Sequence, residues 1–93
     1  MTAKTPSDRL AELRCEIDAV DAQIVALLDR RAKIALNIGV LKSAAGAASP
    51  FDQAREEEVF RKVKAARRGP FPEDVLLKLY KAVIAACRNL QDG

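Results

Sequence analysis

An arginine stands in the middle of a regular apolar pattern near the centre of the sequence. Leu27 and Ile34 belong to a three-four alternation of apolar residues, and the same count places Arg31 between them. A guanidinium that is buried without a partner is costly, so Arg31 must meet a protein carboxylate, a ligand anion or water. A structural ion pair and an anion-binding site are both open at this stage.

Two further polar side chains, Lys42 and Gln91, fall close to apolar stripes. Lys42 lies eleven residues after Arg31, which on a helix means three turns plus about 20° and a rise of about 16 Å. The two cations therefore project from nearly the same face and can converge on one small anion, although Lys42 also suits a solvated helix end. Gln91 follows Cys87 by four residues, either at the end of an apolar stripe or in a frayed terminus.

A carboxylate occupies a similar position in the following segment. Counting back from Val63 through Val59 places Glu56 on the apolar side, where its carboxylate needs a cation or a hydroxyl. Glu57 and Glu58 fit the solvated face instead.

Helices must position these side chains, because no stretch of the sequence shows convincing strand alternation. Thr5 and Pro6 are typical of a helix start, and the first helix is predicted over residues 6–43, with Gly46 as a stop. A second helix is expected to begin near residues 49–52, with Ser49 or Asp52 as its cap, and to end at residues 67–70. A third opens at residues 72–74. We therefore expect one all-α domain over residues 1–93.

The first helix is too long to be covered by its own chain. It would measure about 55 Å, whereas a compact chain of this length has a radius of gyration of about 12 Å. The remaining apolar seam predicts a homodimer of interlocked helices. The seam consists of Leu10, Leu13, Ile17, Val20, Ile24, Leu27, Ile34, Ile38 and Leu41.

Arg14 precedes Arg31 by seventeen residues, which corresponds to about 25 Å along a helix and a rotation of about 100°. One straight helix cannot bring both guanidinium groups to a small ligand. In a twofold dimer with antiparallel first helices, Arg14 of one subunit can enter the pocket of the other.

Composition narrows the classes of function. The 93 residues include 16 Lys and Arg, 13 Asp and Glu, and no histidine, so imidazole catalysis and histidine metal sites are excluded. The net charge of +3 does not favour a nucleic-acid partner. Cys15 and Cys87 show no metal-binding or disulfide pattern, and no apolar run suits a membrane span or a secretory signal. We expect a cytoplasmic protein without metal or cofactor.

The order and spacing of these polar residues resemble the all-helical chorismate mutase family, over nearly the whole chain. The likeness is carried by LRCEIDAVDAQIVALLDRRAKIALNIGVLK, FDQAREEEV and LYKAVIAACRNLQ. The resemblance implies rearrangement of chorismate to prephenate in the biosynthesis of phenylalanine and tyrosine. It also implies that Arg14 of the partner subunit and Arg31 bind the two substrate carboxylates, while Lys42 and Gln91 donate hydrogen bonds to the breaking ether oxygen.

The same resemblance implies roles for four more positions. Arg55 is expected to line the pocket as a further cation, Glu56 to accept from the ring hydroxyl, and Asp52 to contribute through its backbone. Cys87 stands where relatives often carry a serine that touches a carboxylate, and a thiol is a weaker donor.

The reaction is concerted and needs no nucleophile, which fits a site built from Arg, Lys, Gln and Glu. Two sibling activities on the same scaffold stay open, a 4-amino-4-deoxychorismate mutase and an isochorismate pyruvate lyase, although Glu56 favours a substrate with a hydroxyl. A non-catalytic helical interaction module is the alternative of a different class.

Overall fold

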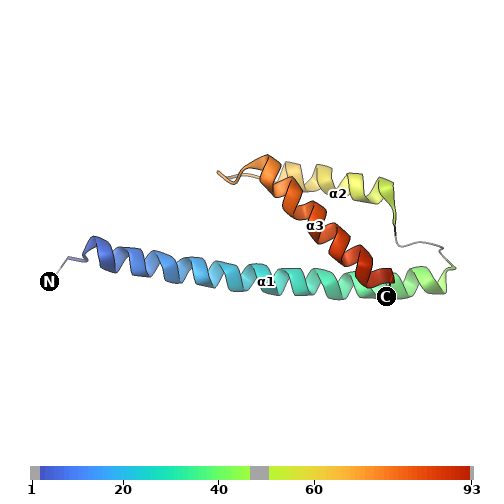
Figure 1. Ribbon diagram of the computed structural model, residues 1–93, viewed down its shortest axis with the longest axis horizontal. Coiled ribbons are helices and arrows are strands. Elements are labelled where there is room, and N and C mark those ends of the chain that lie inside the picture. The colour runs from blue at the N-terminus through green and yellow to red at the C-terminus, as the bar shows by residue number, and fades with distance from the viewer. Residues whose placement is uncertain (1–2, 47–50, 93) are drawn as a thin grey trace. The chain divides into compact units, whose positions relative to one another are not determined.

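The chain folds into three α-helices, and the computed structural model describes residues 3–46 and 51–92. Helix α1 spans Pro6–Ala44, α2 spans Gln53–Ala66 and α3 spans Glu73–Asp92 (Figure 1). No strand occurs within the described ranges, which confirms the predicted all-helical fold with a very long first helix. None of the described helices is long and apolar enough to cross a membrane.

Local chemistry sets both ends of α1. The Asp8 amide donates to Thr5 Oγ1 and the Thr5 amide donates to Asp8 Oδ2, each at 3.1 Å. This reciprocal pair satisfies amides at the start of the helix. At the other end Gly46 has a φ of 77°, a left-handed conformation that glycine adopts without steric cost. The predicted cap and stop are thus confirmed, and the helix extends one residue beyond the predicted position 43.

Helix α2 begins at one of the two caps that the sequence allows. Asp52 Oδ1 accepts a hydrogen bond from the Arg55 amide at 3.0 Å, which makes Asp52 the N-cap. The other candidate, Ser49, lies outside the described residues.

The turn between α2 and α3 is held by an arginine. The Arg67 guanidinium donates to the carbonyl oxygens of Gly69 and Phe71, each at 3.1 Å. An exposed ion pair between Lys64 and Glu73, with 4.0 Å between Nζ and Oε1, joins the two helices near the same turn. These contacts reverse the chain so that α3 can return along α2.

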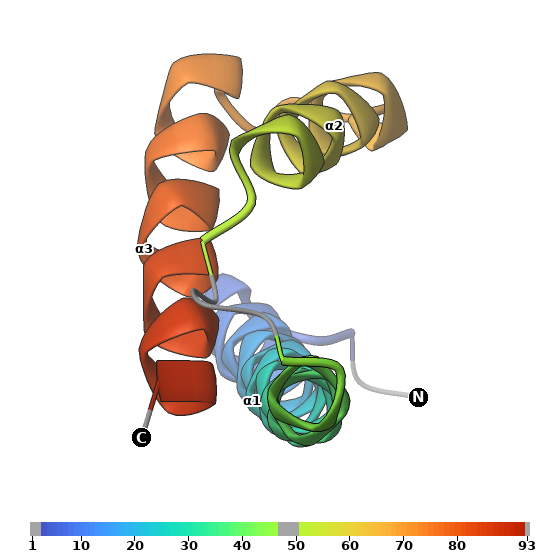
Figure 2. The same ribbon diagram turned by 90° about the vertical axis from the view of Figure 1, so that its right-hand side faces the viewer.

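Two compact units divide the chain, Met1–Arg30 and Arg31–Gly93. The second unit contains the C-terminal part of α1 together with α2 and α3. Within it α2 packs against α3, and the C-terminal turns of α3 lie beside the C-terminal part of α1 (Figure 2). The buried apolar residues of the described chain, Ala35, Ile84 and Cys87, all belong to this unit.

The first unit is the N-terminal part of α1, and its apolar seam is uncovered in the single chain. Six large apolar side chains of the seam are between 42% and 61% exposed: Leu10, Leu13, Ile17, Val20, Ile24 and Leu27. Scattered apolar residues are normal on protein surfaces, but a continuous row along one helix marks an interaction surface.

Candidate active site

A pocket of about 310 Å³ lies among the three helical segments of the second unit. This volume is at the lower end of the range of about 300–1,000 Å³ that is typical of small-molecule sites. Apolar side chains such as Ile34, Ile38 and Ile84 form part of its wall. Seven of the eight residues that the sequence proposes for the site line it: Arg31, Lys42, Asp52, Arg55, Glu56, Cys87 and Gln91.

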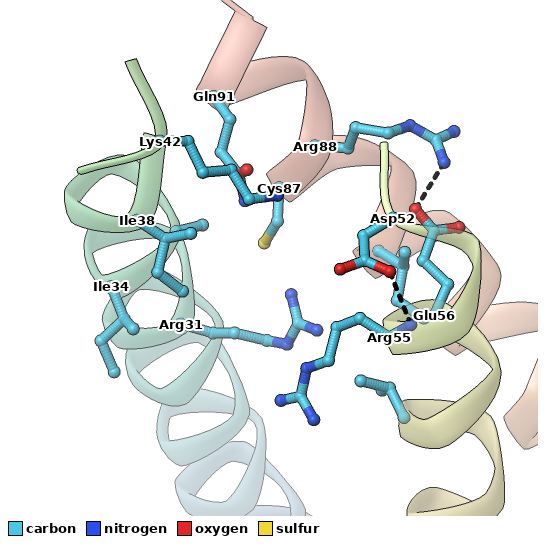
Figure 3. A pocket seen from close by; sticks show the side chains of 13 residues that line it. Arg31, Ile34, Ile38, Lys42, Asp52, Arg55, Glu56, Cys87, Arg88 and Gln91 are labelled. Atoms are coloured by element: carbon cyan, nitrogen blue, oxygen red, sulfur yellow. Dashed lines mark hydrogen bonds and ion pairs between the residues drawn. The ribbon is translucent and has the colours of Figure 1, made fainter. Parts of the chain in front are cut away.

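Helix α1 supplies two half-buried cations, Arg31 and Lys42, to the pocket. The Arg31 side chain extends from α1 into the space between the helices (Figure 3). Within the described part of the chain, the Arg31 guanidinium has no hydrogen-bond or ion-pair partner. The two cations that were predicted to share one face of the helix therefore do line one small space, and Arg31 retains its full capacity to bind an anion.

Helix α2 and its cap supply Asp52, Arg55 and Glu56. Arg55 extends from α2 toward the Arg31 side of the pocket (Figure 3) and forms an ion pair with Glu58 on its own helix. The hydrogen bond from Arg55, followed by the charge of Lys62, lowers the pKa of the Glu58 carboxyl below its usual value. Asp52 has two structural roles, because it caps α2 and also borders the pocket.

The pocket carries an excess of positive charge. Four cationic side chains line it, Arg31, Lys42, Arg55 and Arg88, against the carboxylates of Asp52 and Glu56. Like charges held close together in a partly desolvated space repel one another unless an anion lies between them. Arg88 pairs with Glu56 and Arg55 with Glu58, whereas Arg31 has no such partner among the described residues and can bind a ligand carboxylate.

Helix α3 brings an amide and a thiol to the same space. Cys87 is buried, and Gln91 is half-buried with its Oε1 atom inaccessible to solvent and without a hydrogen-bond partner. Buried polar atoms are nearly always paired in native proteins, so an orphaned amide oxygen at a pocket indicates a place where a polar ligand belongs. Gln91 is not in a solvated, frayed terminus.

The carboxylate of Glu56 pairs with a cation, one of the two kinds of partner that its position predicts. Arg88 Nη1 donates to Glu56 Oε2 at 2.6 Å, and the Arg88 Cζ atom lies 5.1 Å from the centre of the Phe51 ring. Figure 3 draws this ion pair between α3 and the first turn of α2.

The fold and the pocket agree with a known family. The model of the family "Chorismate mutase type II" matches residues 13–92. The chain belongs to this family. The pocket thus lies in the scaffold of a chorismate mutase type II domain, and its lining comes from the matched residues.

Curated relatives carry the same domain within longer proteins. The bifunctional chorismate mutase/prephenate dehydratase of Aquifex aeolicus (strain VF5) is 40% identical over 88 residues, which are 90% of this chain and 24% of that protein. The protein of the same description from Neisseria gonorrhoeae (strain ATCC 700825 / FA 1090) is 33% identical over 85 residues, 91% of this chain and 23% of its own length. The chain spans about a quarter of the length of these relatives.

Solved structures match over almost their entire length. Form II of the chorismate mutase from Thermus thermophilus superposes with a TM-score of 0.84 at 34% identity, covering 90% of this chain and 94% of that one. Form I gives a TM-score of 0.79 at 35% identity, with coverages of 85% and 98%. The three-helix architecture is therefore that of chorismate mutases.

One charged residue of the pocket, Arg88, was not found from the sequence. A signal for it exists, because Arg88 follows Ile84 by four residues and precedes Gln91 by three, so it continues the stripe that faces the pocket. The remaining predicted residue, Arg14, lies on α1 in the first unit, where its side chain is exposed.

Proposed function

We propose that this chain is a chorismate mutase, which rearranges chorismate to prephenate in the biosynthesis of phenylalanine and tyrosine. The observation that carries the proposal is the convergence of Arg31, Lys42, Arg55 and Gln91 on one pocket of a chorismate mutase type II domain. The reaction is a concerted shift in which the ether C–O bond lengthens as a C–C bond forms. The proposal requires no metal or cofactor.

Arginines fix the substrate in this proposal. Arg31 and, across a dimer interface, Arg14 of the partner subunit bind the two carboxylates, and Arg55 adds a third cation. The planar guanidinium can hold a carboxylate through two parallel hydrogen bonds, which fixes orientation as well as charge. Holding both carboxylates selects the compact conformer in which the reacting carbon atoms approach each other. The absence of a protein partner for Arg31 among the described residues supports this role.

Lys42 and Gln91 stabilise the transition state. Negative charge grows on the ether oxygen as the C–O bond lengthens, and donors already aimed at that oxygen lower the barrier. The terminal torsion of a glutamine is roughly twofold, so the Gln91 amide can present either its oxygen or its NH₂ group at the same place. Its unpaired Oε1 supports a site that is completed by a polar ligand.

Glu56 accepts from the ring hydroxyl, while Asp52 and Cys87 complete the wall of the pocket. The ion pair with Arg88 occupies Glu56 Oε2. Within the described residues Oε1 of the same carboxylate has no hydrogen-bond partner, so it is available to the substrate. An acceptor at this position favours a hydroxyl-bearing substrate over one without a donor.

The proposed working form is a homodimer with shared sites. It is supported by the uncovered seam of the first unit, from Leu10 to Leu27, and by the lack of a role for Arg14 within its own unit. A second copy laid along the seam would bury these apolar side chains and deliver Arg14 to the neighbouring pocket. We further propose that residues 1–93 act as a single domain in the cytoplasm, where the thiols of Cys15 and Cys87, which form no disulfide, stay reduced.

The experiment is an assay of the purified chain with chorismate, following the formation of prephenate before and after treatment with a chelator. We expect turnover at an unchanged rate in both conditions. Isochorismate and 4-amino-4-deoxychorismate, assayed in parallel, rank the sibling activities, and a faster reaction of either one reassigns the substrate. A chain that binds none of the three and turns over none of them is an interaction module instead.

A further inference from the structure

Arg88 and Glu56 form a close ion pair that joins two helices at the edge of the pocket. The distance from Arg88 Nη1 to Glu56 Oε2 is 2.6 Å, and the two side chains are 32% and 21% exposed. Charge-assisted hydrogen bonds of this length are among the stronger ones in proteins, and partial burial reduces their screening by solvent. The pair therefore restrains the carboxylate far more than the exposed ion pairs elsewhere on α2 restrain theirs.

The Arg88 guanidinium is itself held in place from a second direction. Its Cζ atom lies 5.1 Å from the centre of the Phe51 ring, within the range of about 6 Å in which cations are attracted to aromatic faces. Phe51 directly precedes Asp52, the cap of α2. In Figure 3 the Arg88 side chain reaches the outer side of Glu56, whereas Arg31 and Arg55 lie on the pocket side.

This arrangement resolves a competition for the carboxylate. Arg31 and Arg55 line the same pocket as Glu56, and either guanidinium would attract an unrestrained carboxylate. A Glu56 side chain that turned toward them would occupy the cations that the proposed function assigns to the substrate carboxylates. Arg88 pairs with Glu56 Oε2, and within the described residues Oε1 of the same carboxylate has no hydrogen-bond partner.

We propose that Arg88 is a positioning residue for substrate recognition, an inference that rests on the proposed function. It holds the Glu56 carboxylate in place to accept from the ring hydroxyl and keeps that carboxylate away from Arg31 and Arg55. Arg88 also lines the pocket, but in this role it acts through the Glu56 carboxylate. An arginine suits the task because its planar fork can bind a carboxylate and stack on a ring at once, which a lysine ammonium does less well.

The experiment compares Arg88→Met and Arg88→Lys with the wild type on two substrates, chorismate and its 4-deoxy analogue, which lacks the ring hydroxyl. We expect Arg88→Met to lower kcat/KM for chorismate about tenfold, the size of one hydrogen bond to a charged group. The loss with the deoxy analogue should be much smaller, because Glu56 has no hydroxyl to accept from. Arg88→Lys should recover part of the loss with chorismate.

Lys64→Met is the matched control, because Lys64 also pairs with a carboxylate across α2 and α3 but does not line the pocket. It should leave both kcat/KM values unchanged. A second test repeats Arg88→Met in a Glu56→Ala background, where the further loss should be less than about twofold because the group to be positioned is gone. Melting curves of all variants show whether each one is folded.

The outcomes separate the inference from the proposed function. Wild-type chain that does not turn over chorismate overturns both. Two results with an active wild type overturn this inference alone: Arg88→Met loses equally on both substrates, or it loses as much without Glu56 as with it. Either result assigns Arg88 a structural role or a direct contact with the substrate instead. Arg88→Met with unchanged kinetics also overturns this inference.

Discussion

The Cα atom of Gln91 lies 3.0 Å from the place that a Cβ atom on Gly39 would occupy. The Cβ and Cγ atoms of Gln91 lie 3.2 and 3.3 Å from the same point. Helix α3 can therefore approach α1 this closely only because residue 39 has no side chain. The contact sets the depth at which the Gln91 amide enters the pocket, beside Lys42 on the following turn of α1.

Replacing this glycine should impair catalysis by shifting the end of α3. Gly39→Ala forces the end of α3 to move by a few tenths of an ångström, which we expect to lower kcat about tenfold, since small displacements of positioned groups are costly. Alanine inside a helix is also more favourable than glycine, which should stabilise α1 by about 0.5–1 kcal/mol and offset part of the cost of the shift. Steady-state kinetics and a melting curve on the same preparation measure the two effects separately.

Gly69→Ala is the control for this change, because a Cβ atom there would meet no atom within 4 Å. It should be kinetically silent. If Gly39→Ala costs as much activity in a Gln91→Ala background as in the wild type, the displaced group is not Gln91.

The two proposed donors to the ether oxygen should act mainly on kcat. Lys42→Ala and Gln91→Ala each remove an interaction that strengthens as charge develops, so each should lower kcat by about 10² or more, by analogy with the loss of one oxyanion donor. The KM for chorismate should change much less. A raised KM with unchanged kcat would instead place these side chains in ground-state binding.

Mixed dimers test whether the pocket is shared between subunits. Arg14→Ala and Arg31→Ala homodimers should each be nearly inactive, because every pocket lacks one arginine. Co-expression of the two variants produces mixed dimers in which one pocket has lost both arginines and the other has lost neither. With random pairing, activity should recover to about a quarter of the wild-type value.

The opposite result of the mixing experiment is equally clear. If both arginines that serve a pocket come from one subunit, every pocket in the mixture still lacks one of them. Co-expression would then restore no activity. That result would contradict both the proposed role of Arg14 and the proposed sharing of each pocket between two subunits.

The ion pair between Arg55 and Glu58 should make a small, pH-dependent contribution to stability. The hydrogen bond from Arg55 and the charge of Lys62 lower the pKa of Glu58 in the folded chain. A carboxyl whose pKa is lowered by folding stabilises the fold at neutral pH, and this contribution is lost as the pH falls through the folded pKa. The urea midpoints of wild type and Glu58→Gln should therefore differ slightly at neutral pH and converge as the pH falls through the lowered pKa of Glu58. Lys62→Met should reproduce a smaller part of the difference.

Local rules predicted the elements of this fold well, because the signals lie within a few residues of one another. Thr5 and Asp8 cap each other across one helical turn, and Gly46 ends α1 through its own backbone. Helical periodicity likewise brought Arg31 and Lys42 to one pocket, since both positions follow from a single rigid helix.

Relationships between helices were harder to predict. Arg88 and Glu56 are separated by 32 positions, and the sequence around each residue gives no signal that the two pair. The sequence indicated that Glu56 needs a cation or a hydroxyl, but which residue supplies it depends on how α3 packs on α2. No role was predicted for Gly39 from the sequence, because its close approach to Gln91 exists only once the two helices are packed.

In the proposed homodimer, the uncovered apolar row of the first unit would tie the amount of folded protein to the abundance of the chain. A chain that completes its core only by pairing has no fixed melting temperature, because dilution alone shifts the equilibrium toward unfolded monomers. Few copies per cell would leave a larger fraction unpaired and open to proteases, so halving synthesis would remove more than half of the folded protein. Dosage, as much as sequence, would then decide how much active enzyme a cell maintains.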